Sequence, residues 1–356
     1  MSVQPDRRRR IVRWGVTAGI LVIALVVPAS GRLLTANASP RLPSRTAAQL
    51  LTDVQTARVD ALSGTVVQHS DLGLPELPGM GPSGSSSLTS LVAGTHTMRL
   101  WYSGPDKARM ALLGTLGESD VIVNGRDVWV WSSAQRTAQH RRLPAPGTSA
   151  RENSARAREL PQTPAEVTRR ALAAVSPTTT VRTDDTVTVA GRSAYELVLA
   201  PRDTRSLVRE VRIAVDSATK APLRFQAFAV GHRAPAFEVG FTQVAFDRPG
   251  AEHFRFVPPP GTTVTEARAD ARVPEANHAA APRVVGTGWT SVIVAKAPSL
   301  GSSPDIERIL AAVRPVHGSW GSGRLLRSAL FSVLLTDDGR VAAGAVTPDL
   351  LYAAVR

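Results

Sequence analysis

The chain has 356 residues, of which 43% are hydrophobic, so it is long enough to bury the cores of two domains. It contains no cysteine, which excludes disulfides, thiol catalysis, iron–sulfur clusters and lipid attachment at an N-terminal cysteine. The formal net charge of +13 suits anionic lipid headgroups or wall polymers, or it reflects a coding bias toward arginine and alanine. Since no stripe of alternating basic and aromatic residues occurs, we expect no nucleic-acid partner.

An arginine cluster precedes an apolar run at the N-terminus. Residues 1–10 form a basic tail that ends in four arginines, and residues 11–29 are mostly apolar. Such a cluster stays in the cytoplasm, so we predict that the bulk of the chain is extracytoplasmic. The run is short for a membrane span, and small residues near Ala29 and Ala38 are compatible with cleavage. We favour a signal anchor, which makes the chain a single-pass cell-membrane protein; the alternative is a signal peptide and secretion.

The region after the leader begins with a polar tether at 30–44 and a helix at 46–58, which apolar residues at helical spacing predict. A strand is expected at 61–69, and the Pro, Gly and Ser content of 71–94 indicates a long loop. Alternating apolar residues and turn signals such as Asn124-Gly125 then predict five short strands. These are 95–102, 106–113, 119–124, 127–133 and 136–143.

A second helix is predicted after the loop at 144–162. Thr163-Pro164-Ala165-Glu166 forms a capping box, so we place a helix at 163–175. Alternation and turn residues predict five more strands, at 186–190, 193–200, 207–215, 222–230 and 236–246. Pro258–Gly261 then ends the first domain, which spans 45–262.

Residues 263–284 show no period and are predicted to be a linker to a small α+β domain at 285–356. In this domain we expect a strand at 288–296 and a loop at 318–323. A hairpin of 325–335 and 341–346 should turn at Asp337–Gly339. Ser303 and Thr347 are each expected to cap a helix.

No motif in the chain points to catalysis. None of the seven histidines pairs with another ligand at helical spacing, so we expect no metal site and no cofactor. Ser217-Ala218-Thr219-Lys220 spells a serine–lysine nucleophile motif but lies in a predicted turn, where the lysine does not reach the serine oxygen. We therefore predict no catalytic residue and no enzyme; a cell-wall or lipid hydrolase is a remote alternative.

Apolar aromatic side chains on the predicted strands are the strongest candidate site. Trp129 and Trp131 are two residues apart and project from one face of a strand. Such residues either wall an apolar ligand pocket under the helices or fill the core. The candidate pocket residues are Trp101, Trp129, Trp131, Phe225, Phe228, Phe237 and Phe241.

Two stretches resemble a known superfamily. Residues 121–143 contain a strand, an Asn-Gly turn, an aromatic strand and a basic strand, and residues 211–226 contain a hairpin that turns between Asp216 and Pro222. Both resemble the LolA-like periplasmic lipoprotein carriers and the sigma-E regulator RseB (MucB). The segment at 72–75 and the arginine and alanine content are similar to actinobacterial members.

This resemblance covers 45–262 and implies a fold of the α+β class, mostly β. The implied architecture is an incomplete antiparallel β-barrel with helices covering its concave face, followed by a small C-terminal domain placed as in RseB. It further implies a non-catalytic binder of a lipid or of the acyl chain of a lipoprotein. The partner it implies is a membrane protein such as an anti-sigma factor or a transporter. The alternative is an RseB-type protein-interaction module with a filled core and no lipid pocket.

Overall fold

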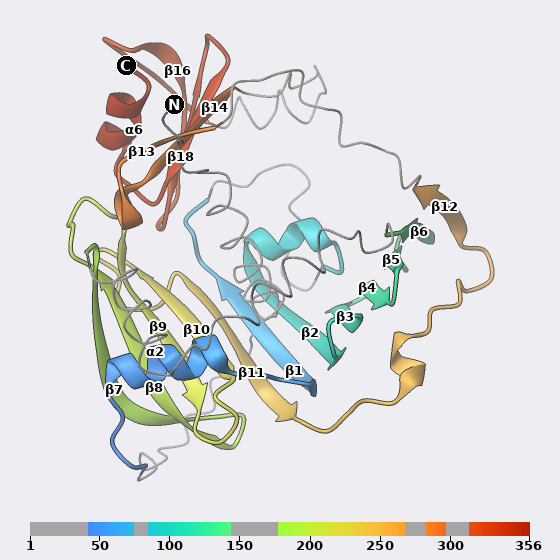
Figure 1. The fold of residues 1–356 in the computed structure, drawn as a ribbon. Coiled ribbons are helices and arrows are strands. Elements are labelled where there is room, and N and C mark those ends of the chain that lie inside the picture. The colour runs from blue at the N-terminus through green and yellow to red at the C-terminus, as the bar shows by residue number, and fades with distance from the viewer. Residues whose placement is uncertain (1–41, 75–84, 144–176, 268–281, 297–312) are drawn as a thin grey trace, which may run out of the picture.

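Two sheets, antiparallel except for one parallel pair at an edge of the larger sheet, form most of the described part of the chain (Figure 1). The computed structural model describes residues 42–74, 85–143, 177–267, 282–296 and 313–356. The larger sheet has twelve strands in the order β12-β6-β5-β4-β3-β2-β1-β11-β10-β9-β8-β7. The smaller sheet has six, in the order β13-β14-β18-β17-β16-β15. Within the described residues the larger sheet stays open, ending at β7 and β12, so the predicted mostly-β, incomplete-barrel class is confirmed.

The larger sheet consists of two runs of neighbouring strands. The first run is β1 (Ala61–Ser70), β2 (Gly94–Ser103), β3 (Lys107–Gly114), β4 (Gly117–Asn124), β5 (Asp127–Ser132) and β6 (Thr137–Arg142). The second run is β7 (Thr179–Val189), β8 (Arg192–Pro201), β9 (Val208–Asp216), β10 (Pro222–Ala229) and β11 (Phe237–Ala245). Antiparallel pairing of β1 with β11 joins the two runs. The ten predicted strands that follow the loop at 71–94 are confirmed, although β7 begins at Thr179, earlier than expected.

Helix α2 (Ala47–Thr56) confirms the helix predicted over 46–58, within two residues at its C-terminal end. Thr46 caps it: its hydroxyl accepts a hydrogen bond from the Gln49 backbone, and the Gln49 side chain accepts one from the Thr46 backbone. Leu50 and Leu51 are buried against Tyr195 and Leu197 of β8. The capping box therefore starts a helix whose apolar stripe lies on the sheet.

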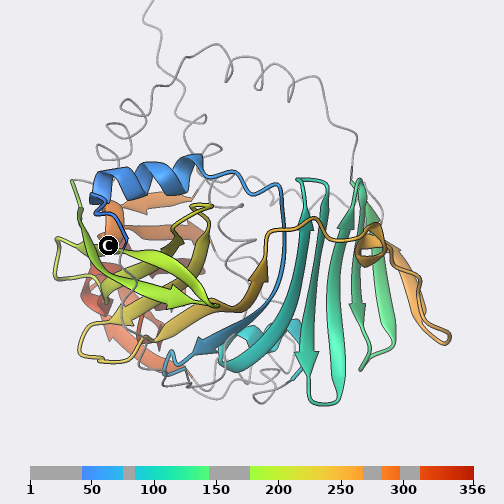
Figure 2. The same ribbon diagram turned by 90° about the horizontal axis from the view of Figure 1, so that it is seen from below.

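The register defines two faces of the larger sheet, because residues paired across antiparallel strands share a face. Leu197, Ile213, Phe225 and Val239 are paired in sequence from β8 to β11, and they lie on the face that α2 covers. The short helix η1 (Leu88–Val92) packs against Val66 and Met98 on this same face. We call it the helix face and call the other the outer face. In Figure 2, α2 lies over the β7–β11 end of the sheet.

The linker prediction at 263–284 needs correction. Its first five residues form β12 (Thr263–Ala267), which pairs in parallel with β6, and Arg283 begins β13 (Arg283–Val285) in the smaller sheet. The 3-10 helix η2 (Ala251–Phe254) lies in the segment that leads to β12. Strand β12 is short and exposed on both faces. Its sequence therefore lacks the alternation of apolar and polar residues from which a strand is predicted.

The smaller sheet comprises β13, β14 (Val292–Lys296), β15 (Arg314–Gly318), β16 (Gly321–Arg327), β17 (Ser332–Thr336) and β18 (Arg340–Gly344). Helix α6 (Pro348–Ala354) packs on one of its faces. The hairpin turn at Asp337–Gly339 is confirmed, and Thr347 occupies the N-cap position without a side-chain hydrogen bond.

Three predictions for this sheet were wrong. Gly288–Thr290 forms the 3-10 helix η3 instead of starting a strand. Residues 325–335 form parts of two strands, β16 and β17, and the predicted loop at 318–323 is a tight β15–β16 turn. Sequence pattern alone misplaced these boundaries because the glycine-rich segment carries no apolar alternation.

The two sheets touch through specific contacts. Ser206 forms a β-bridge with Val346, and the Leu207 backbone N–H donates to the Ala345 carbonyl oxygen at 2.9 Å. The Trp289 indole donates to Thr179 Oγ1 at 2.8 Å. These bonds hold the smaller domain against the β7–β9 end of the larger sheet.

Several predictions lie outside the described residues. They are the leader and most of the tether, the helix at 163–175 and the helix capped by Ser303. Among the described helices, none is long and apolar enough to cross a membrane.

Replacing Leu50 with alanine tests the packing of α2. Leu50 is fully buried, so Leu50→Ala should lower the free energy of unfolding by roughly 2–5 kcal/mol. Gln55→Ala, an exposed position on the same helix, should change it by less than about 0.5 kcal/mol. Denaturant unfolding of both variants is the measurement, and equal stabilities would show that α2 does not pack as described.

Candidate functional site

The seven predicted pocket residues lie on both faces of the larger sheet. Phe225, Phe237 and Phe241 lie on the helix face, in one cluster with Val66 and Met98. Trp101, Trp129 and Trp131 lie on the outer face, as does Phe228. The prediction that all seven surround one pocket under the helices is therefore wrong. Strand alternation shows which residues share a face, but it does not show which face a helix covers.

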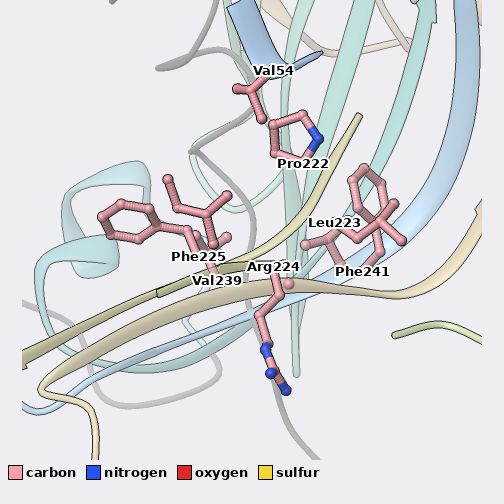
Figure 3. Close-up of a pocket in the computed structure, with 10 residues that line it drawn as sticks. Val54, Pro222, Leu223, Arg224, Phe225, Val239 and Phe241 are labelled. Atoms are coloured by element: carbon pink, nitrogen blue, oxygen red, sulfur yellow. The ribbon is translucent and has the colours of Figure 1, made fainter. Parts of the chain in front are cut away.

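A small apolar pocket lies between α2 and the helix face. Val54 of α2, Val66 of β1, Phe225 of β10, and Val239 and Phe241 of β11 line it. Figure 3 shows the side chain of Arg224, another lining residue, pointing away from Val54 and Pro222. The rings of Phe225 and Phe237 meet edge to face, with centroids 6.2 Å apart. Three residues of the predicted site are thus brought together, two of them lining the pocket directly.

The volume of this pocket is ≈ 30 Å³. Ligand pockets typically enclose about 300–1,000 Å³. The pocket therefore holds about one water-sized molecule in this conformation, and an acyl chain would need more of the helix face.

The helix face continues as an apolar wall beyond the pocket. Met110 of β3 pairs with Val121 of β4, and Val121 pairs with Val130 of β5, so all three share the helix face. The neighbouring Val123–Val128 pair lies on the same face. These side chains are only half-buried. This apolar wall (Met110, Val121, Val123, Val128 and Val130) provides the surface that the small pocket lacks.

Sequence reasoning missed the apolar wall. In β5 the valines alternate with Trp129 and Trp131, so both faces of the strand are apolar. The prediction chose the tryptophans because they are larger, and these lie on the outer face. The valines at alternate positions of β4 and β5 could have indicated it, because apolar residues paired across two neighbouring strands form one surface.

The tryptophans on the outer face are covered by the chain itself. Residues 246–258, which we call the strap, cross this face. His253 of the strap stacks on Trp101 with centroids 5.1 Å apart, and Phe256 contacts both Trp129 and Trp131. Phe254 is buried. The aromatic side chains here form a packed layer.

Phe228 lies on the outer face beneath two arginines. The guanidinium carbons of Arg209 and Arg212 lie 5.0 and 5.6 Å from its ring centroid. Arg212 also forms an ion pair with the buried carboxylate of Glu196 at 2.8 Å. Phe228 thus packs in a layer of paired charges, which gives no apolar surface to a ligand.

A buried carboxyl group lies under the strap side of the sheet. Asp120 accepts a hydrogen bond from Arg109 at 2.5 Å. Burial, together with a hydrogen bond to Glu118, raises the pKa of Asp120 to about 7, although Arg109 acts to lower it. The folded state favours the protonated form of Asp120. The contribution of this group to the free energy of unfolding therefore falls as pH rises from about 4 toward 7.

His140 fixes the edge strand β12. Its Nδ1 lies 2.8 Å from the Glu266 carboxylate of β12, its Nε2 lies 3.0 Å from Asp127, and its ring stacks on Trp129. Burial alone lowers the pKa of His140, but hydrogen bonds to Glu266 and Asp127 outweigh it and raise the pKa above its usual value.

The candidate catalytic motif forms a turn, as predicted. Asp216 accepts hydrogen bonds from the Ala218 and Thr219 backbones, and Lys220 Nζ donates to the Ser217 carbonyl oxygen. Burial raises the pKa of Asp216, but the hydrogen bonds from Arg192 and Thr219 lower it to about 2. Ser217 and Lys220 are therefore part of the turn that connects β9 and β10. Among the described residues no group of three His, Asp or Glu side chains could hold a metal ion.

Trp131→Ala distinguishes packing from ligand binding on the outer face. Because Trp131 packs against Phe256, its loss should lower the free energy of unfolding by roughly 3 kcal/mol and leave binding of apolar ligands unchanged. Trp131→Phe is the control: the indole Nε1 is buried without a partner among the described residues, so the change costs no hydrogen bond. Thermal unfolding and retained lipid should be measured together. Lost ligand at unchanged stability would place the site on the outer face after all.

The His140 contacts predict a pH-dependent contribution to stability. A raised folded-state pKa means that His140 stabilises the fold fully below its unfolded pKa of about 6.5 and loses this contribution as pH rises through the folded value. The stability difference between the parent and His140→Gln should therefore be largest in mild acid and shrink above neutral pH. Urea unfolding between pH 5.5 and 8.5 measures it; a difference that grows with pH would contradict the assignment.

Comparison with known proteins gives similarities of fold. No protein-family model matches the chain, and no curated protein matches it. Among solved structures it is similar to MucB in the Pseudomonas aeruginosa MucA/MucB complex, with 14% identity over 87% of this chain and 96% of that chain and a TM-score of 0.43. It is also similar to a LolA-superfamily protein from Nitrosomonas europaea, with 12% identity over 60% of this chain and 99% of that chain and a TM-score of 0.22.

The third similarity is to an uncharacterized conserved protein from Thermus thermophilus, with 12% identity over 62% of this chain and 98% of that chain and a TM-score of 0.34. The structure of this chain contains an open sheet, a helix on one of its faces and a smaller second sheet. They form the arrangement that the resemblance to the LolA-like and RseB-like superfamily predicted.

Proposed function

We propose that the protein is an extracytoplasmic, membrane-tethered, non-enzymatic binder of an apolar ligand, either a lipid or the acyl chain of a lipoprotein. The observation that carries this proposal is the half-buried apolar wall on the helix face, whose Met110 belongs to the same hydrophobic cluster as Val66 and Phe225 of the pocket beside α2. The arginine cluster and apolar run at the N-terminus support the tether.

The chemistry of the wall suits such a ligand. Met110 and the four valines offer dispersion contacts and no hydrogen-bonding side-chain groups. Each buried methylene of an acyl chain contributes about 0.8 kcal/mol. A chain lying along three strands would therefore be bound without any catalytic group, which agrees with the absence of a catalytic motif in the sequence.

A second candidate function is a protein-interaction module of the RseB type that regulates a membrane partner, such as an anti-sigma factor or a transporter. The ≈ 30 Å³ volume of the pocket favours it, since a filled core leaves no room for an acyl chain. In this case the apolar wall would contact a segment of the partner.

The variant Val128→Thr/Val130→Thr separates these functions. It conserves the side-chain shapes of the apolar wall but adds two hydroxyl groups, which an apolar ligand leaves unpaired. We expect the full chain, purified from membranes in a neutral detergent, to carry lipid, and the variant to carry several-fold less at a similar melting temperature.

The control is Trp129→Phe/Trp131→Phe, which alters the alternate side chains of the same strand on the outer face. It should retain lipid as the parent does. Mass spectrometry of solvent extracts and binding of an environment-sensitive fatty-acid probe are the two readouts. A parent chain that carries no lipid and binds no probe would reject the lipid function and leave the interaction module.

A further inference from the structure

The smaller domain contains a groove that is unlike the apolar wall. It has a volume of ≈ 420 Å³ and lies between α6 and the strands β15 and β16. Val316, Leu325 and Tyr352 form its apolar floor, and Arg314, Arg327 and Asp349 are charged residues along it. The volume falls within the range of about 300–1,000 Å³ that is typical of ligand pockets.

Pairing of the strands places both arginines on the same side of the sheet. Arg314 is paired with Leu325, and Arg327 is two residues beyond Leu325 on β16, so the three side chains share the α6 face. Neither guanidinium forms an ion pair or hydrogen bond with any described residue, whereas Arg340 of the same domain is paired with Asp338. Two arginines thus line the groove without an ion-pair partner among the described residues.

Tyr352 belongs to the apolar floor of the groove and is close in sequence to the charged residue Asp349. Its ring stacks on Trp320, with centroids 5.2 Å apart and planes 10° apart, which fixes its orientation. Burial raises the pKa of Tyr352 and Asp349 raises it further, while Arg314 and Arg327 lower it. Both arginines and Asp349 therefore act electrostatically on Tyr352, which lines the same groove.

We propose that this groove binds an organic phosphate monoester, with the phosphate between Arg314 and Arg327 and the apolar body on Val316, Leu325 and Tyr352. A phosphate monoester carries close to two negative charges at neutral pH and offers three oxygen acceptors, so it satisfies both guanidinium forks. A carboxylate carries one negative charge and two acceptor oxygens, so it matches two guanidinium groups less fully than a phosphate does. Asp349 repels a ligand that extends toward it, which directs the phosphate to the arginines.

This inference is independent of the helix face and stands if the proposed function fails. The same phosphate chemistry occurs in soluble metabolites and in the headgroup of a lipid such as phosphatidic acid. The experiment must therefore include both sources.

The soluble probe is phenyl phosphate, titrated into the full chain in neutral-detergent micelles and followed by ³¹P NMR. We expect saturable binding that Arg314→Gln/Arg327→Gln weakens at least tenfold. Arg324→Gln removes the same charge from β16 on the opposite face, where Arg324 pairs with Pro315, and should bind as the parent does. Arg327→Lys retains the charge without the planar fork and should show an intermediate loss; it also tests the site if the double variant does not fold.

The lipid probe is phosphatidic acid doped into the same micelles, with phosphatidylcholine as the comparison. Arginine-dependent binding of phosphatidic acid would identify a headgroup site, and binding of phenyl phosphate alone would identify a soluble ligand. The proposal is overturned if neither probe binds in an arginine-dependent manner. It is also overturned if inorganic phosphate binds as tightly as phenyl phosphate, because the apolar floor would then contribute nothing.

Discussion

The pairing of β1 with β11 is the constraint on which the large sheet depends. Residues 63–70 pair with residues 237–245, so the contact closes more than half of the chain into one sheet. Without it, β1–β6 and β7–β11 would be two separate antiparallel runs. Gly64 shows how close the approach is, because a Cβ there would lie 2.4 Å from the Gln243 carbonyl oxygen. The register shift at Thr65/Val66 brings Phe241 opposite Val66, where both line the pocket beside α2.

Once the two runs are joined, each face of the sheet must be covered or remain apolar and open. On the outer face the strap provides this cover, because His253 and Phe256 lie on the three tryptophans. After the strap, the chain continues into β12, which pairs with β6. On the helix face, α2 and η1 cover the strands near β8 and β1, while Val121 and its partner Val130 stay half-buried. Trp129 and Trp131 beneath the strap are half-buried, as are Val128 and Val130 of the apolar wall. The two faces therefore differ in chemistry, with an aromatic layer under the strap and an aliphatic wall on the helix face, and the aliphatic wall is the surface that we propose for an apolar ligand.

The sequence was sufficient to predict the local elements of the larger sheet. Capping by Thr46 and turn residues such as Asn124-Gly125 act over a few residues, so α2 and the β4–β5 hairpin were predictable. The choice of face was not, since it depends on contacts between distant segments. Trp129 meets Phe256 of the strap, and Glu266 of β12 meets His140, through pairings that no periodicity encodes. Phe225, Phe237 and Phe241 lie on the helix face, where Phe225 and Phe241 line the small pocket, while Trp101, Trp129, Trp131 and Phe228 lie on the outer face. Contact of any of these residues with a ligand stays a prediction.

The two surfaces that we propose for ligands differ in what they would recognise. The apolar wall offers contact area without direction, so its affinity would grow with the length of an acyl chain and it would discriminate poorly between chains of similar length. The groove beside α6 has two arginines and a stacked tyrosine, so it would select by geometry and charge. The Trp289–Thr179 hydrogen bond and the Ser206–Val346 bridge connect the domains that contain them. Occupancy of one surface can alter the other only if it changes these interdomain contacts, and they are the contacts through which any coupling between the two ligands would have to act.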